Sequence, residues 1–152
     1  MITITYPWQD VQSLSLDAIL WQSPYTLLYF YPKDNTPWCT REAIDFSLKQ
    51  KELQMRDVQV IGVSQDSHTS HCSFHSKHSL TIPLISDPDH VLHNDMRFRV
   101  WGEKSMYGKK YMGTVRSTFL LDTQWEVLKE WRDVSVTGHA DMVLEYIQHN
   151  IW

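Results

Sequence analysis

The sequence predicts an α/β protein with a mixed central sheet and helices on both faces of that sheet. Buried strands alternate with helices in the first half of the chain, which is the order of parallel strand pairing. A short turn joins two strands in the second half, which indicates an antiparallel hairpin. The 152 residues contain no repeat, low-complexity tract or linker, so residues 1–152 are expected to form a single domain around one core.

The first predicted strand is followed directly by the first predicted helix. Residues 25–31 form a continuous apolar and aromatic run, as in a strand whose sheet is covered on both faces. Pro32 ends this run. Thr36 and Pro37 provide a cap and a first turn for a helix over residues 39–55. Three apolar side chains recur along this helix at amphipathic spacing: Ile44, Leu48 and Leu53.

A second strand and helix follow in the same order. Residues 58–63 have the composition of another buried strand, and residues 64–67 carry the polar side chains that cap helices. A helix is therefore predicted over residues 68–79. A short strand over residues 81–85 and a helix over residues 88–98 come next.

The last third of the chain changes in character. Residues 99–113 carry glycine and lysine and are expected to form an excursion. Strands over residues 117–121 and 125–131 flank a turn at residues 122–124. A final helix is predicted over residues 138–149. Its apolar side chains at helical spacing are Met142, Val143, Tyr146 and Ile147.

Charge and composition argue against several functional classes. The formal net charge is -4, from 14 Lys and Arg against 18 Asp and Glu, and no block of like charge indicates a nucleic-acid partner. The first residues provide neither a basic leader nor an apolar run long enough to span a membrane, so a cytoplasmic protein without a membrane partner is expected. Two cysteines are too few for a secreted disulfide framework, yet they suffice for one reversible bridge.

Cys39 lies in the first turn after a strand-to-loop transition. Backbone N–H groups and the positive end of a helix dipole favour a thiolate there, and the thiolate is the nucleophilic form of cysteine. Thr36, three residues earlier, has a hydroxyl that can accept from the thiol or donate to a bound oxygen. Pro32 and Pro37 stiffen the loop. The alternative is an inert buried residue, because free cysteine is among the most buried residue types.

Three segments carry a resemblance to a known family. Tyr31-Pro-Lys-Asp-Asn-Thr-Pro-Trp-Cys39 resembles the Pro-x-x-x-Thr-x-x-Cys motif of peroxiredoxins. Gly62-Val-Ser-Gln-Asp-Ser67 and residues 100–120 are similar to the Q-type, or bacterioferritin-comigratory, subfamily. The matching segments extend from about Ile4 to the end of the chain in the order of the family. The resemblance implies a thioredoxin-like fold and a thiol-dependent peroxidase.

The resemblance also implies a role for each matching residue. Cys39 matches the peroxidatic cysteine, Thr36 the hydroxyl that orients the peroxide, and Pro32 the shield of the pocket. Arg116 completes the set, because its permanent charge can stabilise the thiolate and then the leaving oxygen. Taken alone, Arg116 is equally suited to a surface ion pair. Glu42 matches a position that helps hold the arginine, although a carboxylate in a first helical turn also suits the helix dipole.

The implied reaction is attack of the Cys39 sulfur on the peroxide O–O bond, which leaves a sulfenic acid. A second thiol then condenses with the sulfenic acid before oxidation proceeds further. Many family members carry that thiol five residues after the first, where this chain has Ile44. Cys72 resembles the resolving cysteine of another Q-type branch, which implies a Cys39–Cys72 disulfide formed by local unfolding of both helices. The alternative is resolution by an outside thiol.

The expected substrates are hydrogen peroxide and organic (alkyl) hydroperoxides. The resemblance implies recycling by thioredoxin or a similar dithiol reductant, a monomeric state, and chemistry that needs no cofactor. One local departure concerns the substrate pocket. Trp38 stands where the family usually has glycine, and it places a large ring at the rim of the pocket.

Histidines around Cys72 suggest a rival interpretation. His68, His71, His75 and His78 recur with Cys72 at three- and four-residue steps, so several imidazoles can share one helix face with the sulfur. Such a face can bind zinc or copper. Protonated imidazoles can instead favour the Cys72 thiolate. A solvated helix face is the simpler explanation of these residues.

Two further classes remain as alternatives. A thioredoxin-like protein without chemistry could serve only to bind partners. The joint presence of Pro32, Thr36, Cys39 and Arg116 argues against it. A disulfide oxidoreductase would require Cys-x-x-Cys, and Thr36 occupies the place of its first thiol.

Overall fold

The computed structural model describes residues 1–8 and 10–151 and contains a seven-stranded sheet. In chain order its strands are β1 (Ile2–Thr5), β2 (Val11–Leu14), β3 (Tyr25–Phe30), β4 (Val58–Ser64), β5 (Leu84–Ser86), β8 (Ser117–Leu121) and β9 (Val127–Trp131). Their order across the sheet is β2-β1-β5-β4-β3-β8-β9. The pairs β3–β4 and β4–β5 are parallel and the other pairs are antiparallel. The mixed sheet expected from the sequence is confirmed.

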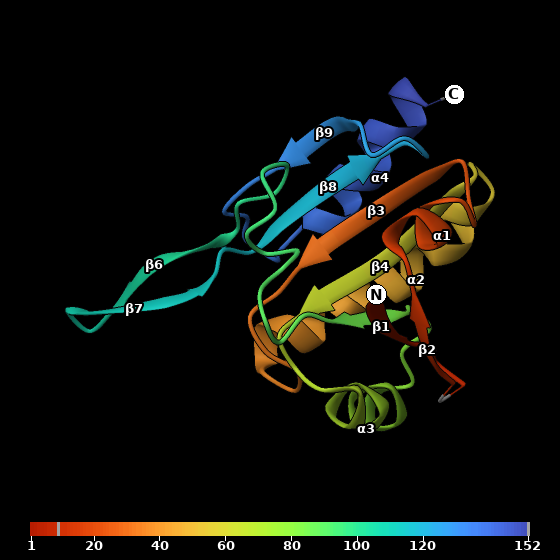
Figure 1. Ribbon diagram of the computed structural model, residues 1–152. Coiled ribbons are helices and arrows are strands. Elements are labelled where there is room, and N and C mark those ends of the chain that lie inside the picture. Colours follow the sequence, from red (N-terminus) through yellow and green to blue (C-terminus); the bar gives the residue numbers. More distant parts are fainter. Residues whose placement is uncertain (9, 152) are drawn as a thin grey trace.

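Helices cover both faces of this sheet, as predicted. One face carries the short helix α1 (Leu16–Leu20), which lies in front of the sheet in Figure 1. The opposite face carries α2 (Pro37–Gln54), α3 (His68–His78) and α4 (His139–Asn150). None of the described helices is both long and apolar enough to cross a membrane.

The sheet divides the buried side chains into two cores. The α2-side core includes Leu27, Tyr29, Phe46, Phe74 and Val143. The α1-side core includes Ile19, Leu28, Phe30, Ile61 and Phe119. Successive residues of β3 point to opposite faces and are buried on both, which explains why this strand is a continuous apolar run.

A second, two-stranded sheet projects from the body of the molecule (Figure 1). It consists of β6 (Trp101–Met106) and β7 (Lys109–Thr114), joined at Tyr107 and Gly108. Both turn residues have positive φ, 53° and 78°, as a two-residue hairpin turn of type I′ requires. The excursion expected over residues 99–113 therefore takes the form of a β-hairpin, which the sequence pattern did not indicate.

The predicted helix over residues 88–98 is wrong, because this segment forms a series of turns. The Asp87 carboxylate accepts hydrogen bonds from the backbone N–H groups of Leu92 and His93 at 3.2 and 2.9 Å. Those amides are thus unavailable for helical pairing. Positive φ values at His90 and Arg99 interrupt the backbone further.

Two amphipathic assignments need correction. Leu48 is 74% exposed, and α2 buries Ala43, Phe46 and Leu53 instead. Met142 of α4 is exposed as well, while Val143 and Ile147 are buried as expected. The predicted strand over residues 81–85 is reduced to Leu84–Ser86.

Candidate active site

Strand register brings Cys39 and Arg116 to the same edge of the sheet. Strand β3 ends at Phe30 and the chain passes through a loop into α2, whose N-cap is Thr36 and whose first residue is Pro37. Strand β8 is antiparallel to β3, and its first residue, Ser117, lies opposite Phe30. Arg116 therefore enters the sheet where β3 leaves it, although 77 positions separate it from Cys39.

Cys39 occupies the first turn of α2, as predicted. The first backbone bond of the helix runs from the N–H of Thr40 to the carbonyl of Thr36 at 2.9 Å, so the N–H of Cys39 precedes the intrahelical ladder. The residue is 1% exposed and its thiol is free. Its sulfur thus lies near the positive end of the helix dipole, in a site with little access to water.

The Arg116 guanidinium joins Cys39 to Glu42. Its Nη2 lies 3.3 Å from the Cys39 sulfur, and its Nη1 donates to Glu42 Oε1 at 2.5 Å. A rigid fork of N–H groups suits these two acceptors at once, because each nitrogen addresses a different one. The predicted association of Cys39, Glu42 and Arg116 is present in the structure.

Burial controls the charge on this group of residues. Desolvation raises the pKa of Glu42 to about 7, and attraction to Arg116 opposes that rise only in part. Glu42 Oε2 has no hydrogen-bond partner among the described residues. Burial also acts to lower the pKa of Arg116, but attraction to Glu42 and Cys39 outweighs it and raises the pKa above the usual value. The guanidinium therefore keeps its charge beside the sulfur.

Thr36 lies on the loop before α2, and its hydroxyl already donates a hydrogen bond within that loop. Its Oγ1 donates to the carbonyl of Lys33 at 2.8 Å and makes no capping bond to the helix. With its proton donated to Lys33, the hydroxyl can act toward a bound peroxide as an acceptor, so accepting is the favoured one of the two roles expected for it. Pro32, at the start of the same loop, is half-buried.

Two side chains that the sequence did not single out lie close enough to Arg116 for its charge to affect their pKa values. Lys104 of β6 donates to the carbonyl of Thr114 at 2.9 Å, and burial and the nearby Arg116 lower its pKa. Burial, with a smaller contribution from Arg116, lowers the pKa of His139 to about 4. This imidazole, bonded to Thr118 at 2.7 Å, is therefore neutral beside the arginine. Neither residue has a local sequence signal, because each reaches the site only through the tertiary fold.

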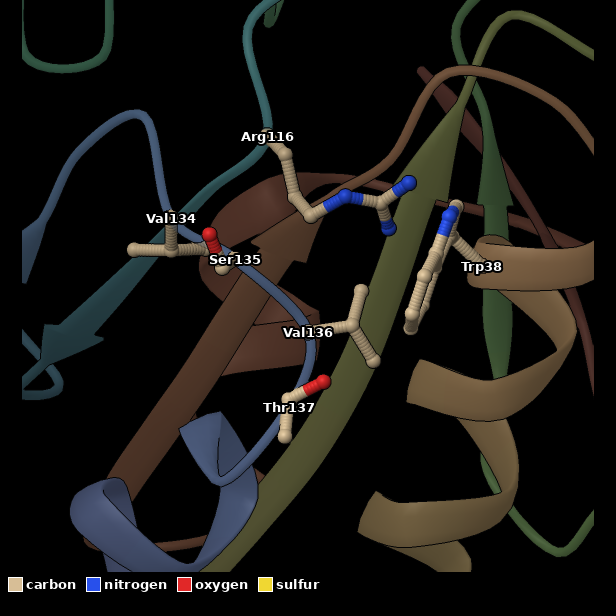
Figure 2. Close-up of a pocket in the computed structure, with 6 residues that line it drawn as sticks. All are labelled: Trp38, Arg116, Val134, Ser135, Val136 and Thr137. Carbon is tan, nitrogen blue, oxygen red and sulfur yellow. The ribbon is translucent and has the colours of Figure 1, made fainter.

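A pocket of about 420 Å³ adjoins the Arg116 side chain (Figure 2). Its lining residues are Trp38, Arg116, Val134, Ser135, Val136 and Thr137. Residues 134–137 belong to the segment between β9 and α4, for which the sequence predicted no function. Arg116 thus has one side toward the pocket and a nitrogen within hydrogen-bonding distance of Cys39.

Cys72 lies on α3, as predicted, and its thiol is half-buried and free. The neighbouring histidines do not form a common face around it. His71 is fully buried, and its Nδ1 and Nε2 contact Asp34 Oδ2 at 2.7 Å and the carbonyl of Ile85 at 3.1 Å. His75 Nε2 contacts the carbonyl of Ile82 at 2.6 Å.

The remaining histidines of this helix are also accounted for by packing or solvent. His78 packs edge-on against Phe74, and His68 is exposed. Within residues 1–8 and 10–151, no group of three or more His, Cys, Asp and Glu side chains is arranged to hold a metal ion. The geometry therefore does not favour the metal-binding interpretation.

A cysteine at a helix N-terminus with a guanidinium on its sulfur defines a site for thiol chemistry on an α/β sheet. Comparison with known proteins makes this class specific. The family model described as AhpC/TSA matches residues 1–129. Peroxiredoxin Bcp of Xanthomonas campestris pv. campestris is 46% identical over 120 residues, which cover 79% of this chain and 74% of that protein. Peroxiredoxin Bcp of Bacillus subtilis is 43% identical over 128 residues, 84% of this chain and 80% of that protein.

A solved structure gives the same result for the fold. The bacterioferritin comigratory protein of Xanthomonas campestris, described in a study of its alkyl peroxide reduction activity, superimposes with a TM-score of 0.83 at 37% identity. The match covers 99% of this chain and 92% of that one. The chain therefore belongs to the AhpC/TSA family and is a thioredoxin-like peroxiredoxin of the bacterioferritin-comigratory type. As such, it is a thiol-dependent peroxidase.

Proposed function

We propose that Cys39 is the peroxidatic cysteine and that Arg116 and Thr36 bind the peroxide beside it. The observation that carries this proposal is the 3.3 Å contact between Arg116 Nη2 and the Cys39 sulfur. Glu42 holds the guanidinium in place, and Pro32 shields the loop side of the sulfur. The permanent charge of Arg116 favours the Cys39 thiolate and then the oxygen that leaves it.

In the proposed reaction, the Cys39 thiolate attacks the terminal oxygen of the hydroperoxide. An S–O bond forms and the O–O bond breaks, so the sulfur is oxidised to a sulfenic acid while the hydroperoxide is reduced to an alcohol or water. Thr36 accepts a hydrogen bond from the hydroperoxide O–H, since its own hydroxyl proton is donated to the backbone carbonyl of Lys33. Arg116 donates to the leaving oxygen as negative charge develops there, and that oxygen leaves as the alcohol or water after taking up a proton.

Cys72 is the proposed resolving thiol. Its sulfur attacks the Cys39 sulfenic acid, an S–S bond forms, and the hydroxyl leaves as water. The two thiols lie on separate helices, α2 and α3, and neither is in a disulfide in this structure. Disulfide formation therefore involves local unfolding of the first turn of α2 and part of α3.

The proposed substrates are hydrogen peroxide and alkyl hydroperoxides, and the proposed reductant is thioredoxin or a similar dithiol protein. Thiol–disulfide exchange with such a donor returns both cysteines to the free state.

We infer a monomer in the cytoplasm, where thiols are kept reduced. Sedimentation of the reduced and the oxidised protein tests the monomer, and a dimer in either state would contradict it.

Peroxide consumption coupled to a thioredoxin system tests the roles of the two cysteines. Cys39→Ser should abolish turnover, and Cys72→Ser should abolish thioredoxin-supported turnover while keeping one rapid reaction with peroxide. Mass spectrometry of the peroxide-treated wild type should find an intramolecular bridge between the peptides of Cys39 and Cys72. Activity that survives Cys39→Ser would overturn the central assignment, and two free thiols or only intermolecular bridges would overturn the role of Cys72.

Arg116→Lys tests the guanidinium separately. Lysine keeps the charge but cannot address the sulfur and Glu42 with two nitrogens, so the rate of Cys39 oxidation should fall about 100-fold. Arg41→Lys on the exposed side of α2 is the matched control and should leave the rate unchanged. Equal rates for both variants would contradict the role of Arg116.

A further inference from the structure

Trp38 and Cys39 are neighbours in the first turn of α2, but their environments are opposite. Cys39 is 1% exposed, whereas the Trp38 side chain is 58% exposed. Because most of the Trp38 indole remains in contact with water in the folded protein, it contributes little to the stability of the hydrophobic core. The position of Trp38 is therefore not explained by packing of α2 against the sheet.

The Trp38 ring forms one wall of the pocket beside Arg116. Figure 2 shows the ring on α2 across the pocket from Val136, with the Arg116 guanidinium directed toward the gap between them. Val134 and Val136 supply the opposite wall from the segment that precedes α4. Two segments about 100 residues apart in sequence thus create one concave surface, with Trp38 on one wall and the two valines on the other.

Among the described residues that line this pocket, Arg116 is the only charged one, and the same side chain contacts the Cys39 sulfur. A hydroperoxide with its oxygens at Arg116 and Cys39 would therefore direct its organic substituent between Trp38 and the valines. Hydrogen peroxide has no substituent to place there. The volume of about 420 Å³ is ample for a substituent the size of a phenyl ring.

We propose that Trp38 is a specificity-determining residue, which binds the apolar substituent of an organic hydroperoxide and favours aryl substituents through ring contact. Aromatic pairs gain energy beyond the area that they bury, and a branched valine wall packs against the other face of a flat substituent. The inference rests on the proposed role of Cys39, since it places the peroxide oxygens at that sulfur. The ratio of the rate constant for an aryl hydroperoxide to that for hydrogen peroxide should accordingly be higher with Trp38 present than without it.

The test measures the second-order rate constant of Cys39 oxidation in single turnovers with cumene hydroperoxide, tert-butyl hydroperoxide and hydrogen peroxide. Trp38→Gly should lower the ratio of the cumene hydroperoxide constant to the hydrogen peroxide constant by about 10-fold. Trp38→Phe should keep most of that ratio, because it retains an aromatic face. Val136→Ala should lower the ratio from the opposite wall, without any change in α2.

Trp21→Ala is the matched control, since Trp21 is also exposed but follows α1 on the other face of the sheet. It should leave all three constants unchanged. Cumyl alcohol, the reduced product, should inhibit the wild type competitively and the Trp38→Gly variant about 10-fold more weakly. Far-UV circular dichroism and thermal unfolding of each variant exclude a general loss of structure.

Two results would overturn the inference. In one, the ratio for Trp38→Gly stays within about twofold of the wild type; in the other, both constants fall together, as expected for a purely structural role. Cys39→Ser separates these failures from a failure of the proposed function. If that variant is inactive while the ratio does not respond to Trp38, only the role of Trp38 is wrong; if it remains active, the role of Cys39 is wrong.

Discussion

The guanidinium of Arg116 has two acceptors that compete for its charge, the Cys39 sulfur and the Glu42 carboxylate. Burial raises the pKa of Glu42 to about 7, so the carboxylate is partly protonated near neutral pH. A partly neutral Glu42 leaves more of the positive charge of Arg116 for the sulfur. A fully ionised carboxylate at this position would hold the arginine more firmly and compensate its charge more completely.

The raised pKa of Glu42 predicts how the stability of the protein depends on pH. Because the folded-state pKa of about 7 exceeds the ordinary glutamate value of 4.5, the folded protein binds more protons than the unfolded chain between these values. The stabilisation is complete below pH 4.5 and is lost as the pH rises through about 7. Relative to Glu42→Gln, the wild type should lose up to about 3 kcal/mol of unfolding free energy across this window.

Chemical denaturation of both proteins across this pH window provides the measurement. All other titrating groups are shared, so their contributions cancel in the difference between wild type and Glu42→Gln. Glu52→Gln, which makes the same substitution at an exposed position of α2, serves as the control and should leave the pH dependence of the unfolding free energy unchanged. A difference that does not vary with pH would show that Glu42 ionises normally in the folded protein.

The chemistry of the site was predictable from sequence to different degrees. Cys39, Thr36 and Arg116 were identified because they belong to a motif or a matching segment, and the structure brings Cys39 and Arg116 into contact. The direction of the Thr36 hydroxyl was not predictable, since it depends on the position of the Lys33 carbonyl. The pocket residues Val134 and Val136 carry no local sequence signal, because the sequence alone does not distinguish a valine that lines a pocket from a valine that packs in the core.

At the scale of elements, the carboxyl ends of β3 and β4 bring two loops together. These strands are parallel neighbours, so the loop before α2 and the loop before α3 leave the same edge of the sheet. Asp34 of the first loop is buried and accepts hydrogen bonds at 2.7 Å from Tyr31, Ser70 and His71. Ser70 and His71 belong to α3, so Asp34 ties the active-site loop to the helix that carries Cys72.

This tie should oppose disulfide formation, since α3 must loosen before Cys72 reaches Cys39. Ser70→Ala removes one bond to the buried carboxylate without altering the active-site loop, and a bond to a charged group contributes about 1.5–3 kcal/mol. The rate of Cys39–Cys72 disulfide formation should therefore rise about 10-fold, while the rate of sulfenic acid formation stays the same. Rapid quenching with a thiol-blocking reagent, followed by mass spectrometry, measures the two steps separately.

Ser73→Ala is the matched control for this prediction. It makes the same substitution one turn further along α3, at an exposed position. If Ser70→Ala and Ser73→Ala form the disulfide at the same rate, Asp34 does not restrain the helix. A faster disulfide should also leave less sulfenic acid available for further oxidation, so Ser70→Ala should resist inactivation at high peroxide concentration.

Elements with a clear hydrophobic pattern were the predictable ones. The strands β3 and β4 are apolar on both faces, and α2 begins at the predicted Thr36–Pro37 cap. The segment over residues 88–98 resembles a helix in composition. In the folded chain, however, the Asp87 carboxylate accepts hydrogen bonds from two of its backbone N–H groups, a contact that the sequence does not reveal. The β6–β7 hairpin was missed because its strands are largely exposed and lack apolar alternation.

At the scale of the whole molecule, the sheet separates the parts that must move from the parts that need not. Cys39, on α2, and Phe74, on α3, both contribute to the α2-side core. The α1-side core contains neither helix and is closed by residues of β3, β4 and β8 together with α1. Because β3, β4 and β8 are buried on both faces, unfolding of a helix turn on one face of the sheet leaves the side chains on the other face packed.

This separation predicts where oxidation will loosen the protein. Formation of the Cys39–Cys72 disulfide should speed amide hydrogen exchange at least about 10-fold in α3, in the first turn of α2 and in the loop between β3 and α2. Exchange in β3, β4 and α1 should remain at the level of the reduced protein. Hydrogen-exchange mass spectrometry compares the reduced protein, the peroxide-treated protein and peroxide-treated Cys72→Ser, which can form the sulfenic acid but not the bridge. Unchanged exchange in α3 after oxidation, or an equal increase in α1, would mean that the bridge forms without local unfolding or only through global unfolding.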